Sequence, residues 1–265
     1  MRIAGLPRGY RIQAVRRDRH HGLASGIVIL SSRSSNVNTP SLPKEEFEGA
    51  LARLIESVLF GKAHVVIGRG LSAKVIADPV IAHTAPTFWG MSIYAHFDMA
   101  QLIALKLFDE QRNALTIEYL LDRASEHPEA FPKATPERVA AIADTARTQI
   151  SNLTIHLTPI RAKRNRIIAH ADSTIVRDPE RLAKDTQVTF SNLNAIFETA
   201  AGILNEISVA YRDVSPLWPL LGEDDFEGAV QLIVDAKHAQ VDQYENKFGS
   251  PAPFPRPASQ RSRIY

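Results

Sequence analysis

Residues 159–172 hold the side chains of this sequence that could act together on a phosphate. The segment reads Pro-Ile-Arg-Ala-Lys-Arg-Asn-Arg-Ile-Ile-Ala-His-Ala-Asp. Four cations precede a single histidine, His170, and they are Arg161, Lys163, Arg164 and Arg166. Arginine binds a phosphate through a forked, permanently charged group, and an imidazole can exchange a proton near neutral pH. The segment is therefore suited to holding a phosphate and moving a proton beside it.

On one helix, Arg164, Asn165 and His170 would not form a complete site. Arg164 and His170 are six residues apart, which corresponds to roughly 9 Å of rise and about 120° of rotation around a helix. Neighbours on a helix surface pair at three or four residues instead. Two copies of the helix, meeting across a two-fold axis, would bring two Arg–His pairs into one cleft. In such a cleft His170 could act as a general base or acid.

Simpler interpretations of these residues stay open. The four cations could form a solvated helix face. His170 could cap the C-terminus of its helix, where the dipole favours a cationic imidazole. Asp172 suits a turn better than a catalytic acid, although it could pair with a cation of the site.

The other histidines and glycines indicate no competing site. Three histidines are isolated in the sequence: His64, His83 and His156. His96 and Asp98 lie two residues apart and would face different sides of a helix, and no His-Glu-x-x-His spacing occurs. Gly68-Arg69-Gly70 lacks the Lys-Ser/Thr of a phosphate loop and predicts a turn. We therefore expect neither a metal nor a cofactor.

The composition is that of an ordinary globular protein with an uneven distribution of charge. The 265 residues are 45% hydrophobic and 23% charged, and they include no cysteine, which excludes disulfides and cysteine-ligated metal sites. Residues 1–40 hold seven arginines and one acid, a charge of +6, and residues 251–265 hold three arginines, a charge of +3. The total of +2 leaves −7 for residues 41–250. A body of that sign repels nucleic acid as a whole, so contact with RNA must be local or helped by the ends of the chain.

Composition also divides the chain. Residues 1–40 are expected to form a flexible Arg/Ser-rich segment, residues 41–248 a helical domain, and residues 249–265 a disordered Pro/Arg-rich tail. No apolar run is long enough to span a bilayer. We expect a cytoplasmic protein without a membrane segment.

In the first half of the domain, apolar residues recur at intervals of three and four residues, which predicts several helices. The first begins near Ser41 and is interrupted at Gly68 and Gly70, and residues 71–82 form a short, weaker helix that ends near Asp78-Pro79. Thr87 opens a broadly apolar helix that reaches Phe108. Thr116 is placed to cap a shorter one.

In the second half, Thr135-Pro136-Glu137 is a strong helix start, with a capping hydroxyl, a proline in the first turn and an early acid. Pro159 either kinks this helix or restarts it, and the basic stretch continues as a helix to about Ala171. Asp178-Pro179 closes a connection. A long helix covers residues 186–211, and Glu223 opens the last one. Neither a strand pattern nor an internal repeat competes, so the fold class is an all-α bundle of six to eight helices.

The segment Arg164-Asn165-Arg166-Ile167-Ile168-Ala169-His170 resembles the Arg-(Asn)-x4-His signature of the HEPN superfamily of helical ribonucleases. The wider pattern from Arg161 to Asp172 is similar to the abortive-infection branch of that superfamily, the AbiU-like proteins. The expected helices at 88–108 and 186–211 also resemble that branch, and the resemblance covers roughly residues 45–245.

The resemblance implies a metal-independent endoribonuclease that acts as a homodimer and needs no cofactor. His170 would take the proton of the ribose 2′-hydroxyl or protonate the leaving 5′-oxygen. Arg164 would stabilise charge on the phosphate, and Asn165 would orient His170 or the phosphate. Arg161, Lys163 and Arg166 would bind RNA. The products would be a 2′,3′-cyclic phosphate and a 5′-hydroxyl. Many members are toxins or antiphage effectors restrained by an antitoxin protein.

Two alternatives use the same basic segment without catalysis. Some members of the superfamily have lost cleavage and bind only RNA or protein, which makes a non-catalytic binding module the first alternative. The second is a scaffold whose cations complement an acidic partner. Replacement of His170 separates both from a ribonuclease, because proton transfer alone requires the imidazole.

Overall fold

The structure is a computed structural model that describes residues 44–110, 114–165, 178–216 and 223–251. All the elements in these ranges are helical, which confirms the all-α fold. They are α1 (Lys44–Ala77), α2 (Pro79–Thr84), α3 (Pro86–Leu107), α4 (Ile117–Glu126), a 3₁₀ turn (Pro128–Ala130), α5 (Pro136–Asn152), α6 (Thr154–Lys163), α8 (Pro179–Asp185), α9 (Phe190–Arg212) and α10 (Glu223–Phe248). In this described part of the chain, no helix combines the length and apolar character needed to cross a membrane.

Side-chain caps set several helix starts, two of them, at Thr116 and Thr135, where the sequence predicts them. The Thr116 hydroxyl accepts a hydrogen bond from the Tyr119 amide at the start of α4, and Thr135 accepts one from Arg138 at the start of α5. Thr189 and Asn192 form a reciprocal capping box at the start of α9. Such caps satisfy amides that have no partner within the first turn of a helix.

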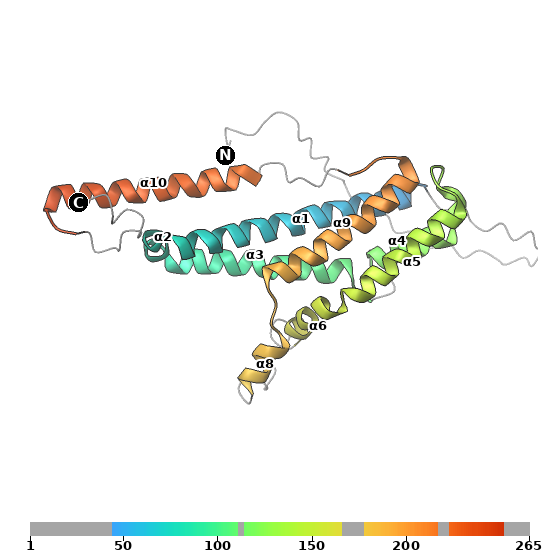
Figure 1. Cartoon of the computed structure of the whole chain (residues 1–265), viewed down its shortest axis with the longest axis horizontal. Helices are drawn as coiled ribbons and strands as arrows, with labels where there is room; N and C mark the ends of the chain where they lie inside the picture. The colour runs from blue at the N-terminus through green and yellow to red at the C-terminus, as the bar shows by residue number, and fades with distance from the viewer. Residues whose placement is uncertain (1–43, 111–113, 166–177, 217–222, 252–265) are drawn as a thin grey trace, which may run out of the picture. The chain divides into compact units, whose positions relative to one another are not determined.

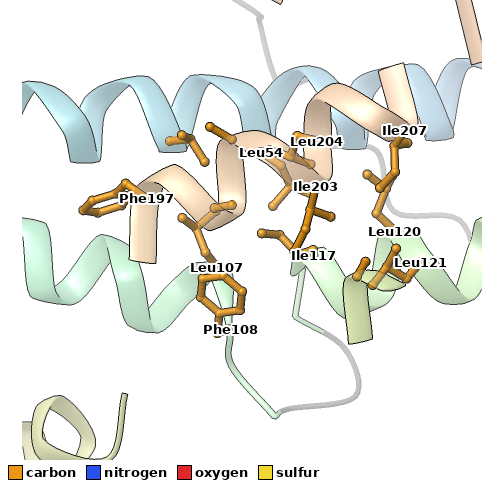
Figure 2. Close-up of a cluster of buried hydrophobic side chains, with 14 of the residues drawn as sticks. Leu54, Leu107, Phe108, Ile117, Leu120, Leu121, Phe197, Ile203, Leu204 and Ile207 are labelled. Carbon is orange, nitrogen blue, oxygen red and sulfur yellow. The ribbon is translucent and has the colours of Figure 1, made fainter. Parts of the chain in front are cut away.

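The main core lies where α1, α3 and α9 pack together, and α4, α5 and α6 add to it. In Figure 1 α3 runs alongside α1, and α9 lies against both. Figure 2 shows Leu54 of α1 and Leu107 of α3 among side chains from α4 and α9. Leu54, Leu107 and Phe197 are at most 2% exposed. Burial of each such side chain contributes about 1.5–3 kcal/mol and is the main force that holds the bundle together.

A second, smaller cluster joins α10 to the helices around α2. It contains Leu71, Ile81, Trp89, Val230 and Val234. Next to it, His238 Nε2 lies 2.9 Å from Asp78 Oδ2, and both side chains are largely buried. Gly249 follows α10 with a φ of 61°, a left-handed conformation that favours glycine at the end of a helix.

The predicted interruption at Gly68 and Gly70 is wrong, because α1 continues through both residues as one helix. The absence of a side chain at Gly68 has a packing reason. A Cβ there would lie 2.8 Å from the Phe190 ring and 3.2 Å from His96 Cβ. The close approach of α3 and α9 therefore requires glycine, at a cost in helix propensity that packing offsets.

Other boundaries also differ from the predictions. Helix α3 starts at Pro86, one residue before Thr87. The connection ends at Asp178 as expected, but residues 179–185, to which the sequence assigned no helix, form α8, whose start is capped by Asp178. Helix α9 begins at Phe190 and not at residue 186, because Thr189 is its N-cap. The expected flexible segment at residues 1–40 and residues 252–265 of the expected tail at 249–265 lie outside the described residues.

Candidate functional site

The basic segment begins on α6, which starts after a break at Leu153. The sequence predicted either a kink or a restart at Pro159. The restart lies at Leu153 instead, and Pro159 lies inside α6. Pro159 has no amide to bond the Ile155 carbonyl, and the Ile155 side chain is 73% exposed, so water can solvate that turn. Leu157 and Ile160 are buried and hold one face of α6 on the core.

Lys163 is turned towards α3. Its Nζ lies 2.8 Å from Asp98 Oδ1 and 5.0 Å from the centre of the Phe97 ring. The same Asp98 oxygen accepts a hydrogen bond from Gln101 Nε2 at 3.1 Å. The Lys163 side chain is only 19% exposed, so this cation links α6 to α3.

Arg161 links α6 to the C-terminal end of α3. Its Nη2 donates to the Phe108 carbonyl at 3.0 Å, and its Nη1 lies 2.9 Å from Glu110 Oε1. Beside it is a cleft of about 540 Å³, lined by residues of α4, α5 and α6 that include Tyr119 and Ile150. Arg161 is thus also a structural cation, with part of its side chain open to the cleft.

Arg164 and Asn165 are arranged differently. Helical hydrogen bonding widens to a π-type turn at these two residues, a distortion that often marks functional sites. Arg164 Nε donates to Asn165 Oδ1 at 3.0 Å, and Asn165 is exposed. Among the described residues, no carboxylate forms an ion pair with Arg164. In the described part of the chain, its guanidinium therefore differs from the Arg161 guanidinium and the Lys163 ammonium, each of which is paired with a carboxylate.

Arg161 and Lys163 lie in the last turn of α6, and Arg164 and Asn165 follow it directly. Of these four side chains, the contacts described above join only Arg164 and Asn165. Arg166, His170 and Asp172 lie outside the described residues, as does the expected helical stretch up to Ala171. The geometry of the proposed Arg164–His170 pair is therefore a prediction from the sequence.

A pair of histidines between α1 and α3 was missed by sequence reasoning. His64 Nδ1 lies 2.8 Å from His96 Nδ1, and the two rings are 5.0 Å apart between centres. Burial lowers the pKa of both imidazoles, and the neighbouring His96 lowers the pKa of His64 further. A neutral pair can share one Nδ1 proton as a hydrogen bond.

No sequence spacing pointed to this pair, because His64 and His96 are 32 residues apart and on different helices. His64, isolated in the sequence, thus has a partner in the structure, and so does His156. His156 Nδ1 lies 3.1 Å from Asn192 Nδ2, the residue that completes the α9 capping box. Histidine, aspartate and glutamate side chains of the described residues do not gather in groups of three or more that could hold a metal ion.

Comparison with known protein families shows that the family model for AbiU2, named HEPN_AbiU2, matches residues 51–232. This range includes α6 and the whole of residues 159–172. No curated protein and no solved structure matches the chain.

Proposed function

Since this chain belongs to the AbiU2 family of HEPN domains, which relates it to abortive infection, we propose that it is a metal-independent endoribonuclease. It would act as a cytoplasmic toxin or antiphage effector and be restrained by an antitoxin protein. The observation that carries the proposal is the contrast on α6. Arg161 and Lys163 are paired with carboxylates of the bundle, whereas the Arg164 side chain donates a hydrogen bond to the exposed Asn165.

In the proposed reaction, His170 removes the proton of a ribose 2′-hydroxyl, and the 2′-oxygen attacks the adjacent phosphorus. The bond from phosphorus to the 5′-oxygen breaks, and the 5′-oxygen takes a proton from a second acid, for which His170 of a second copy is the candidate. Arg164 stabilises the negative charge on the phosphate oxygens, and Asn165 holds Arg164 through its 3.0 Å hydrogen bond. The products are a 2′,3′-cyclic phosphate and a 5′-hydroxyl.

Arg161, Lys163 and Arg166 serve RNA binding in this proposal. Arg161 and Lys163 act mainly by positioning α6 and adding positive potential, since each already has a carboxylate partner. The acidic body limits attraction for RNA to this local patch. Binding should therefore weaken steeply as salt concentration rises.

The test is incubation of the purified chain with mixed RNA in EDTA, followed by analysis of product ends. We expect cleavage that leaves a cyclic phosphate, and no cleavage by His170→Ala or Arg164→Ala. A matched control is Arg53→Ala, which removes a cation from an exposed ion pair with Glu56 on α1. Cleavage by the His170 variant at the wild-type rate would overturn the assignment.

The alternative is a non-catalytic helical module that binds RNA or a protein through the same helix. The use of two cations for packing favours it, because these contacts give α6 a structural role whether or not RNA is cut. Absence of cleavage by a folded protein, together with RNA binding that His170→Gln leaves unchanged, would support this module.

A further inference from the structure

The outward side of α3 carries an apolar stripe that the described bundle leaves largely uncovered. We call it the α3 stripe, and it consists of Phe88, Met91, Ala95, Met99 and Leu102, with Tyr94 at its edge. Leu102 is partly buried and the others are exposed. Phe88 is 60% exposed, Met91 66% and Met99 44%. Large apolar side chains that gather on one exposed face mark an interaction site more often than a free surface.

The stripe also lacks charge. Within residues 86–105 the chain has a single carboxylate, Asp98, and no lysine or arginine. Asp98 is already paired with Lys163. Between Phe88 and Leu102 a strongly charged partner would therefore find no unpaired charge to complement. The first exposed cation on this face is Lys106, one turn beyond Leu102.

The spacing of the stripe is symmetric about Ala95. Met91 and Met99 lie four residues on either side of it, and Phe88 and Leu102 lie seven residues on either side. Offsets of four and seven place all five residues on one face of a helix. A two-fold axis at Ala95 would set Met91 against Met99 of an antiparallel copy, and Phe88 against Leu102. The small side chain of Ala95 would let the two helices approach closely where they cross.

We propose that the α3 stripe is the interface between two copies of this chain, with the two-fold axis at Ala95. A surface that complements itself in shape, and has no like charges to bring together, is what an isologous interface requires. Burial of the stripe would remove on the order of 500 Å² from each copy, counting its aromatic and methionine side chains. A standard interface covers about 800 Å² per partner, so the stripe forms its core and a polar rim completes it.

This interface also explains how two basic segments could meet. Asp98 lies three residues from Ala95, about 4.5 Å along the α3 axis. It holds Lys163 at 2.8 Å, and therefore holds the end of α6 beside the seam. Pairing through the stripe brings two α6 ends to the same seam, and with them two copies of Arg164. This last step rests on the proposed function, whereas the interface itself does not.

The absence of native cysteine allows a direct test on the full chain. In Ala95→Cys the two thiols would face each other at the axis, within the 4.4–6.8 Å Cα separation that a disulfide needs. We expect mild oxidation to give a covalent dimer of Ala95→Cys. The matched control is Ala52→Cys, at an exposed alanine of α1, which should stay uncrosslinked.

A second variant measures the strength of the interface. We expect Met91→Glu to weaken dimerisation about 30-fold or more in sedimentation, because it buries an unpaired carboxylate in the seam. Its melting temperature at low concentration should match that of the wild-type monomer. Ile76→Glu, at a residue 80% exposed outside the stripe, is the control and should leave the dimer intact.

Two results would overturn the interface. One is a wild-type chain that stays monomeric at high micromolar concentration. The other is a dimer that resists Met91→Glu and does not crosslink through Ala95→Cys, which would place the contact elsewhere, for example on a segment outside the described residues. Neither assay uses RNA. A dimer that crosslinks at Ala95 but cleaves nothing would therefore keep the interface and overturn only the ribonuclease proposal.

Discussion

The apolar main core between α1, α3 and α9 and the polar contacts that attach α6 stabilise the same bundle by different means. In the main core, Leu51, Leu54 and Phe197 are at most 2% exposed, and their side chains pack together with those of neighbouring helices. The end of α6 is attached by the Lys163–Asp98 ion pair and by the hydrogen bond from Arg161 to the Phe108 carbonyl.

The difference separates folding from function. Apolar packing is dense and intolerant of added volume, and it contributes most of the stability. A few directional contacts contribute less, but they fix the orientation of the helix on which they lie. Substitutions in the main core should therefore alter stability. Substitution of Arg164, which lies just after the residues that attach α6, should alter activity alone.

The largest expected effect is on activity. Arg164→Ala should lower the rate of RNA cleavage about 10²–10³-fold, the loss that removal of one charge-stabilising donor gives. The free energy of unfolding should change by less than about 0.5 kcal/mol, because no carboxylate of the described residues depends on Arg164. Cleavage kinetics and urea unfolding of one preparation check both parts. A large loss of stability would show that Arg164 belongs with the structural cations.

The next largest effect is on the stability of the main core. A Cβ on Gly61 would overlap the Phe197 ring, so Gly61→Ala should destabilise the protein by about 3 kcal/mol. Gly49→Ala, in the same helix with nothing within 4 Å of the added methyl, should stabilise it by about 0.5–1 kcal/mol. Thermal unfolding of the pair gives the comparison. Equal effects at both glycines would contradict the close approach of α1 and α9.

Asp98→Ala should have an intermediate effect on stability. The Lys163 side chain is only 19% exposed and would lose its partner, which should lower the free energy of unfolding by about 2 kcal/mol. Combination with Lys163→Met should recover part of the loss, since no unpaired cation then remains. The matched control is the exposed pair of Arg53 and Glu56, whose removal should cost less than about 0.5 kcal/mol. Additive losses in the Asp98–Lys163 cycle would mean that the two residues do not interact.

The smallest effect should come from pH. The pKa of His64 and His96 is lowered in the folded protein, so below about pH 6.5 the unfolded chain binds protons that the folded chain does not. Stability should therefore fall as the pH drops from 7.5 to 5.5, by less than the loss from Asp98→Ala. His64→Gln should reduce this dependence in urea unfolding. A variant with the same dependence as wild type would assign it to other groups.

Local patterns in the sequence anticipated much of the fold and the family, whereas the roles of the site residues stay predictions. Thr116 and Thr135 cap helices as predicted, because capping depends on residues within one turn. The Arg164-Asn165…His170 spacing pointed to the HEPN superfamily and its AbiU-like branch, and the family match confirms that assignment.

What the sequence determined by itself was therefore local or periodic: the apolar repeats that make every described element a helix, and the order of cations and histidine along residues 159–172. The tertiary structure alone decided which distant side chains meet. It placed His64 against His96, kept α1 helical across Gly68 so that Phe190 could pack there, and paired Lys163 with Asp98, leaving Arg164 outside. These contacts join residues far apart in the chain, and their formation depends on how whole helices pack, which no short stretch of sequence encodes.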